Sequence, residues 1–266
     1  MASSATNPNP SNHTNSAPIS PVFITTESLH SILSHHILIQ HFHTSLPTVS
    51  SSLHTPIRQI HEISRSSSLL LMPSWSTSPS LPFTGVKLVT YFPQNSSINL
   101  PGIHASYVLF SSTTGQTLAS TDGTVLTLYR TSCVSGLASN ILAREDSQVL
   151  VMVGAGALAP HLIKAHLAAR PSLRKETMRE CDDEAIKRGR VFVDNEAALV
   201  EAEELVGAIE RGVIDKKDVG FLVDLIKGDN IGRRNPEEIT VFKSVGSAVV
   251  DILAAQLVYE GYVKSA

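Results

Sequence analysis

Cysteine and charge are scarce in the first part of this chain. Cys133 and Cys181 are the only cysteines among 266 residues, so neither a disulfide framework nor a structural zinc ribbon is expected. No lysine or arginine precedes Arg58, and Glu27 is the only acid before it. The net charge of −3 gives the chain no electrostatic attraction for nucleic acid, and we expect no nucleic-acid partner.

Long apolar runs are absent as well. No stretch reaches the roughly 18 residues that span a bilayer, so no membrane partner is expected. Residues 1–21 are rich in Ser, Asn and Pro and show no apolar periodicity, which predicts a disordered N-terminus. This segment is serine-rich and acid-free like a chloroplast transit peptide, but it lacks the arginines. Composition therefore leaves a chloroplast and a cytoplasmic location open.

Helical and strand-like patterns follow in turn. The spacing of apolar residues predicts a helix that begins with Thr26 as N-cap and ends before Pro47. Short apolar runs at 68–72, 86–92, 105–110 and 117–120 alternate with Pro, Gly and Ser clusters. They predict one antiparallel meander within residues 55–125. A second helix, packed through small residues, is predicted over 131–143.

The next segment has the pattern of a dinucleotide-binding turn. An apolar, fully buried strand is predicted at 148–153, and a helical stretch follows at 160–170. Between them the glycines allow a tight turn and a close approach to a pyrophosphate, and the helix N-terminus offers unpaired N–H groups. The alternative to cofactor binding is a tight turn with a structural role only. The candidate cofactor-binding residues here are Gly154, Ala155, Gly156, Ala157, Leu158 and Ala159.

The continuation expected of such a domain is missing. In a complete dinucleotide-binding domain, a second strand follows within about 20 residues and ends in an Asp or Glu that binds the ribose. Here Lys175 runs directly into Glu176, which starts a charged segment that reads as a helix. The nucleotide-binding domain therefore looks incomplete.

Three cations, Arg58, Lys87 and Arg130, lie in apolar or strand-like surroundings, where a charge is costly unless it is paired. They could converge on the carboxylate of a ligand. Salt bridges to Asp122 or Glu62 would explain them equally well.

For the histidines near residue 40 and for Cys133, a structural role is the favoured interpretation. His35, His36, His41 and His43 have no carboxylate or cysteine beside them and share a helix with Ile and Leu, so no metal site is expected. Cys133, close to Arg130 in the sequence, suggests a nucleophile, but a small residue on a buried helix face is the favoured interpretation.

Seven segments together resemble the ornithine cyclodeaminase and mu-crystallin family, and within it the plant ketimine reductases that form pipecolic acid. The resemblance runs from about residue 22 to the end. It is carried by Leu71–Trp75, Val86–Thr90, Asp122–Thr131, Val153–Gly156, Met178–Asp183, Val191–Asp194 and Ile239–Gly246.

The resemblance implies an α/β and α+β architecture. An N- and C-terminal α+β domain for substrate binding and dimerisation, residues 22–143 plus 236–266, would flank an inserted Rossmann-like domain, residues 144–235, which is truncated here. The implied activity is NADPH- or NADH-dependent reduction of a cyclic imine carboxylate, 1-piperideine-2-carboxylate, to pipecolate. The implied setting is lysine catabolism and plant defence in the chloroplast.

Site roles are implied position by position. Arg58 and Arg130 match carboxylate-binding arginines, and Lys87 matches the active-site lysine, which holds the carboxylate or donates a proton. Thr240 to Ser244 match a segment facing the nicotinamide, so Thr240 and Ser244 join the cofactor-binding residues. No metal is implied.

Two departures qualify the implied activity. About two βαβ units, each of ~30 residues, have no counterpart between Lys175 and Glu176. Glu203 stands where the family usually has Gly. The implied assembly is a homodimer or a mixed dimer with a full-length subunit. The alternatives are an inactive shortened form, a non-catalytic ligand-binding protein, and an ornithine cyclodeaminase.

Overall fold

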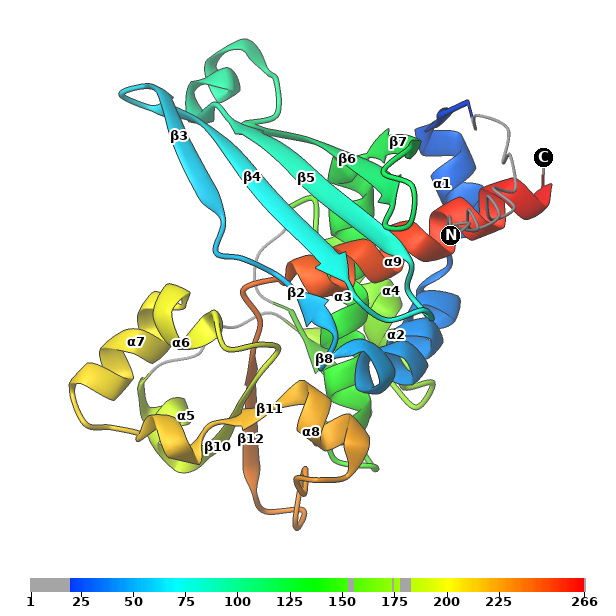
Figure 1. Ribbon diagram of the computed structural model, residues 1–266. Helices are drawn as coiled ribbons and strands as arrows, with labels where there is room; N and C mark the ends of the chain where they lie inside the picture. Colours follow the sequence, from blue (N-terminus) through cyan, green and yellow to red (C-terminus); the bar gives the residue numbers. More distant parts are fainter. Residues whose placement is uncertain (1–19, 153–155, 174, 178–182, 266) are drawn as a thin grey trace, which may run out of the picture.

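The computed structural model describes residues 20–152, 156–173, 175–177 and 183–265. A large sheet backed by helices forms one part, and short parallel strands with small helices form the other (Figure 1). Most of the predicted disordered N-terminus, residues 1–19, lies outside the described residues.

The large sheet is the predicted antiparallel meander, extended at both edges. Its order is β1-β7-β6-β5-β4-β2, and β3 also pairs with β4. The strand β1 precedes the helices in the chain and pairs in parallel with β7. The strands are β1 (Val22–Ile24), β2 (Leu53–His54), β3 (Gln59–Ser64), β4 (Ser67–Ser76), β5 (Phe83–Tyr91), β6 (Ile103–Ser111) and β7 (Thr117–Asp122), with a 3-10 turn η1 (Pro93–Ile98) before β6.

The first helical region consists of two helices, so the prediction of one was wrong. Helix α1 (Thr26–Ile32) is capped by Thr25, and α2 (His35–Val49) is capped by Ser34, whose hydroxyl accepts from the Ile37 N–H. The expected end before Pro47 was also wrong, because Pro47 lies in the last turn of α2. There a proline removes one backbone hydrogen bond without interrupting the helix interior.

Helix α3 (Gly123–Leu142) begins earlier than the predicted Thr131. Asp122 decides its start, because Oδ1 accepts from Thr124 N at 2.9 Å and from Val125 N at 3.0 Å. A carboxylate at this position satisfies N–H groups that have no partner within the helix. Asp122 therefore serves as an N-cap.

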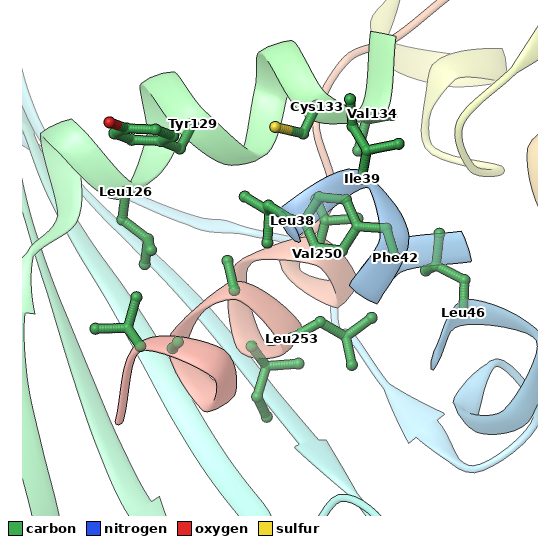
Figure 2. Packing of buried hydrophobic residues seen from close by; sticks show 14 of the residues in the cluster. Leu38, Ile39, Phe42, Leu46, Leu126, Tyr129, Cys133, Val134, Val250 and Leu253 are labelled. Atoms are coloured by element: carbon green, nitrogen blue, oxygen red, sulfur yellow. The ribbon is translucent and has the colours of Figure 1, made fainter. Parts of the chain in front are cut away.

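The main core lies where α2, α3 and the C-terminal helix α9 (Ala248–Ser265) meet beneath the sheet. Figure 2 shows Leu38 and Phe42 of α2 facing Leu126 of α3 and Leu253 of α9, and all four side chains are fully buried. Helix α9 crosses the sheet next to β4 and β5 (Figure 1). No described helix is long and apolar enough to cross a membrane.

Cys133 is part of this core, which confirms the structural interpretation of that residue. Burial raises the pKa of its thiol to about 12, so almost no reactive thiolate forms at pH 8. We expect iodoacetamide at pH 8 to leave the Cys133 peptide unmodified in the native protein and to alkylate it in urea, as followed by mass spectrometry. Native labelling at the rate of a free thiol would contradict this burial.

Besides the large sheet, the chain has two short parallel sheets. Strand β8 (Val149–Val151) pairs with β9 (Lys175–Thr177), and helix α4 (Ala159–Ala169) connects them and packs against α3 of the main core. Strand β10 (Gly189–Val193) lies between β11 (Gly220–Phe221) and β12 (Ile239–Lys243). The remaining elements are α5 (Asp183–Arg188), α6 (Ala198–Glu201), α7 (Glu203–Glu210), η2 (Lys216–Asp218) and α8 (Leu222–Lys227).

Three expectations about this part need correction. The strand predicted as fully buried is β8, yet Val149 is 51% exposed, because β8 belongs to a two-stranded sheet. Residues 175–177 form strand β9 rather than a helix start, since backbone pairing with β8 outweighs their polar side chains. Strand β12, expected to belong with the C-terminal α+β part, pairs with β10.

Candidate active site

The centre of the site is a buried group of three charges. Lys87 Nζ on β5 lies 2.7 Å from Asp251 Oδ2 on α9. Arg130 Nε on α3 lies 2.9 Å from Asp251 Oδ1. One carboxylate is thus shared by two cations that come from the sheet and from a different helix.

The fold explains why these charges meet. Side chains alternate along β5, so Lys87 shares the buried face of the sheet with Phe83 and Gly85. Helix α9 covers that face, and Asp251 lies in its first turn, where the helix dipole favours a negative charge. Arg130 is buried in α3, which packs against α9. All three side chains are at most 7% exposed.

Burial and neighbouring charges act in opposite directions on Lys87. Desolvation lowers the pKa of its ammonium, the Asp251 carboxylate raises it, and the positive charges of Arg130 and Arg58 lower it again. Tyr107 lies opposite Lys87 on β6, and burial raises the pKa of its phenol, which therefore stays neutral. Lys87 is consequently easier to deprotonate than an exposed lysine.

The group carries a surplus positive charge. Two cations and one carboxylate leave a net charge of about +1 in a desolvated place, where an uncompensated charge is costly. In addition, Arg130 Nη1 is buried without a hydrogen-bond partner among the described residues. A monoanion that accepts from this donor would satisfy both.

Arg58, the third predicted cation, has a different partner. Its guanidinium pairs with the Glu201 carboxylate of α6, and both side chains are about one-third exposed. The structure thus joins Lys87 and Arg130 on one carboxylate and places Arg58 in an ion pair that reaches the second part of the molecule. Neither Asp122 nor Glu62, the partners considered from sequence, takes these roles.

The loop after β12 connects this charge group to the parallel sheet. Asp194, at the carboxyl end of β10, accepts from the Ser244 hydroxyl at 2.6 Å and from Gly246 N at 3.0 Å. A cavity of about 540 Å³ opens beside this loop and is lined in part by Asp194, Asn195 and Ser247. Ligands of parallel sheets usually bind at the carboxyl ends of the strands, which is where this cavity lies.

Gly246 is needed for this connection. Its φ is +81°, and a Cβ built there would lie 2.5 Å from Arg130 Nη1, so only glycine lets the guanidinium lie against the loop.

We expect Gly246→Ala to lower the free energy of unfolding by about 2 kcal/mol or more, through backbone strain and displacement of Arg130. Urea denaturation followed by circular dichroism measures the loss. Gly228→Ala is the matched control, because Gly228 has the same φ of +81° with no atom within 4 Å of the added Cβ. Equal losses in the two variants would show that Arg130 does not approach the loop in this way.

Thr240 and Ser244 lie at opposite ends of β12, about 13 Å apart at the usual rise per residue. Thr240 donates to the Leu142 carbonyl at 2.9 Å and accepts from Arg233 at 2.9 Å, so it joins β12 to the end of α3. Ser244 lies at the loop beside the cavity. Cofactor binding stays a prediction for both residues.

The glycine-rich turn is described in part. Gly154 and Ala155 lie outside the described residues. Gly156 has open space where a Cβ would be, and its carbonyl accepts from Ala159 N at 3.0 Å at the start of α4. Ala157 and Leu158 complete the turn into the helix. Gly156 and Ala157 are exposed just before the N-terminus of α4.

The histidines of α2 do not form a metal site. His35 packs against the rings of Tyr129 and His161, and His41 Nε2 lies 3.1 Å from the Leu253 carbonyl oxygen. His36 and His43 are exposed. Within the described ranges no three His, Cys, Asp or Glu side chains gather as a metal site would require.

Comparisons with known proteins agree with this architecture. The sequence model of the ornithine cyclodeaminase/mu-crystallin family matches residues 20–175 and 165–266. The Arabidopsis thaliana protein SAR DEFICIENT 4 is 54% identical over an alignment 317 residues long. The alignment covers 91% of this chain and 98% of the relative. The chain belongs to the ornithine cyclodeaminase/mu-crystallin family.

Reductases occur among the other family relatives. A Δ1-pyrroline-2-carboxylate reductase of Colwellia psychrerythraea is 30% identical and covers 89% of this chain and 98% of its own length. The structure of the Thermococcus litoralis enzyme of that name, in complex with NADH and L-proline, superposes with a TM-score of 0.82 at 24% identity. The superposition covers 91% of this chain and 98% of the Thermococcus chain, which confirms the α/β family fold.

The alignments with the Arabidopsis relative and with the family model both point to a gap inside this chain. The alignment to the Arabidopsis relative is 317 residues long, whereas the whole chain has 266 residues, so the relative has residues inside the alignment without a counterpart here. The two stretches that match the family model overlap at residues 165–175. This overlap runs from Ala165 in the second half of α4 to Lys175, the first residue of β9.

Sequence reasoning missed Asp251, Asp194 and Gly246. A signal for Asp251 was present, because it stands alone in the apolar helical stretch Val249–Ala255 and therefore needs a partner. Asp194 was noticed only as part of a motif, and nothing in the sequence showed that it would bind the loop after β12.

Proposed function

We propose that this chain binds a cyclic imine that carries a carboxylate next to the C=N bond, and that it is built to reduce the imine with NADPH or NADH. The proposed substrate is 1-piperideine-2-carboxylate and the proposed product is pipecolate. The observation that carries this is the buried charge group, which has a surplus positive charge and a free donor on Arg130. A small monocarboxylate fits both features.

In this proposal each cation has a role. Arg130 donates from Nη1 to the substrate carboxylate and fixes the ring plane, as a planar guanidinium can. Lys87 is the catalytic residue, and its lowered pKa suits a group that passes a proton to the imine nitrogen. Desolvation strengthens both interactions, since the side chains of Lys87, Arg130 and Asp251 are buried. Arg58, now paired with Glu201, is a second carboxylate-binding group at the edge.

The described turn fits the phosphate part of a dinucleotide. The backbone at Gly156 and the N-terminus of α4 would hold the pyrophosphate, because open space lies where a Cβ of residue 156 would be and a helix N-terminus offers unpaired N–H groups. Ser244 would face the nicotinamide from the loop after β12. When NAD(P)H is bound, the chemistry that it supplies is hydride transfer to the carbon of the C=N bond.

The proposal includes a shortened nucleotide-binding domain. Strands β8 and β9 form a sheet separate from β10, β11 and β12, whereas a dinucleotide-binding fold has one continuous parallel sheet. The exposed Val149 and the family alignment, which is longer than this chain, support a missing internal segment after Lys175. We therefore propose that this chain binds substrate and reduces it poorly.

Two assays on the purified chain test the function. Calorimetric titration with pyrrole-2-carboxylate, a planar ring carboxylate that NADPH does not reduce, is expected to show one site per chain. Loss of NADPH absorbance at 340 nm with 1-piperideine-2-carboxylate measures turnover, which should be slow. Absence of analogue binding would refute the substrate proposal, and fast turnover would refute the shortened domain.

A second candidate is a ligand-binding subunit of a mixed dimer with a full-length reductase. The complete charge group beside a divided nucleotide sheet favours this candidate. Co-expression of the tagged chain with the full-length subunit, followed by affinity purification, tests it. A fluorescent fusion would test the proposed chloroplast location against a cytoplasmic one.

A further inference from the structure

Asp251 is a buried carboxylate without a structural task of its own. It caps no helix, because the Ser247 hydroxyl takes the Val249 N–H at the start of α9. Its side chain is 1% exposed, and in the described part of the chain its oxygens contact the two cations at ion-pair distance. Burial of an acid is costly unless it is paired, so the place of Asp251 is tied to these two cations.

The groups around Lys87 show which neighbour favours its charged form. Arg130 on α3 and Arg58 before β3 add positive charge near Lys87, and Tyr107 on β6 stays neutral. Among the described groups that influence Lys87, Asp251 is the one that favours the charged ammonium. Without this carboxylate, burial and two arginines would all favour the neutral amine.

Asp251 also orients Arg130. The contact with Oδ1 is made through Nε, on one side of the guanidinium. Nη1 then lies beside Gly246 and keeps no partner among the described residues. If Asp251 contacted Nη1 instead, the buried N–H of Nη1 would no longer be available to the carboxylate of the substrate.

We propose that Asp251 is a positioning residue: it keeps Lys87 protonated and holds Arg130 by Nε, so that one ammonium and one free guanidinium edge remain for the substrate. This inference rests on the proposed function. Asp251 acts through the two cations and donates no proton itself.

The pKa of Lys87 can be measured without any ligand. The full chain is labelled with [ε-13C]lysine, and the Lys87 signal is assigned by its loss in Lys87→Met. An opposite charge at this distance raises a lysine pKa by about 1 to 3 units, so Asp251→Asn should lower the Lys87 pKa by at least ~1 unit. Asp251→Glu, which keeps the charge, should restore most of the shift. If Asp251→Asn does not fold, Asp251→Ser leaves room for water and tests the same point.

Binding of pyrrole-2-carboxylate between pH 6 and pH 10 gives the second measurement. In the parent chain, affinity should fall as Lys87 loses its proton, and in Asp251→Asn this fall should move to lower pH by the shift seen in the NMR titration. A loss of affinity that is equal at every pH, with an unchanged Lys87 pKa, would overturn the inference and leave Asp251 a structural residue. If the Lys87 pKa shifts but the parent chain binds no analogue, the proposed function fails while the control of Lys87 by Asp251 stands.

Discussion

Inserting the internal segment of the Arabidopsis relative between Lys175 and Glu176 is expected to raise NADPH-dependent reduction of 1-piperideine-2-carboxylate by about 1,000-fold or more. Holding two reactants in a productive geometry is worth at least this factor. Under the proposed function, the separate sheets β8–β9 and β11-β10-β12 do not hold the nicotinamide and the imine in such a geometry. The initial rate of NADPH oxidation by the purified insertion variant gives the result directly.

The control for this experiment is a Gly/Ser linker of the same length at the same position. The linker should not raise turnover above the level of the parent chain, because it supplies no strand to the nucleotide-binding sheet. Neither insertion should abolish binding of pyrrole-2-carboxylate, because Lys87, Arg130 and Asp251 lie on β5, α3 and α9. A parent chain that turns over within about tenfold of the insertion variant would mean that the nucleotide site is already complete.

Replacing Arg130 by methionine is expected to weaken pyrrole-2-carboxylate binding by about 100-fold or more. The change removes the surplus positive charge, since Asp251 and Lys87 then neutralise each other, and it removes the free Nη1 donor. Removing one partner of a buried charge pair between a ligand and its site costs roughly 2–5 kcal/mol of binding free energy. Calorimetry at pH 7.5 measures the loss, and circular dichroism establishes that the variant is folded.

Arg58→Met provides the comparison for Arg130→Met. Arg58 is about one-third exposed and already has the Glu201 carboxylate, so solvent screening limits its effect to a few-fold loss of affinity. If Arg58→Met weakens binding more than Arg130→Met does, the substrate carboxylate lies at the Arg58–Glu201 pair and the assignment of the central site is wrong.

The sequence was sufficient to find the cations but not their partner. Lys87 within Val86–Thr90 and Arg130 in its apolar surroundings stand out because burial makes an unpaired charge expensive. The partner, Asp251, lies in the last helix, and its approach depends on how α9 crosses the sheet. No local pattern encodes that crossing.

The same contrast holds for the fold. Alternating apolar residues and turn clusters were enough to predict β4 to β7, because each strand pairs with its neighbour in sequence. Burial of β8 could not be judged from its apolar residues, since exposure depends on which strands lie beside it. The start of α3 was misplaced because the cap at Asp122 was not recognised.

The position of Asp251 near the end of the chain constrains the order of folding. Lys87 and Arg130 cannot leave water cheaply until the carboxylate is beside them, so β5 and α3 can complete their packing only when α9 docks. We therefore expect docking of the C-terminal helix to be a late step, because a long stretch of chain separates it from the meander. Until then the inner face of the sheet remains wet, and a nascent chain that stops short of α9 would present this face to other proteins.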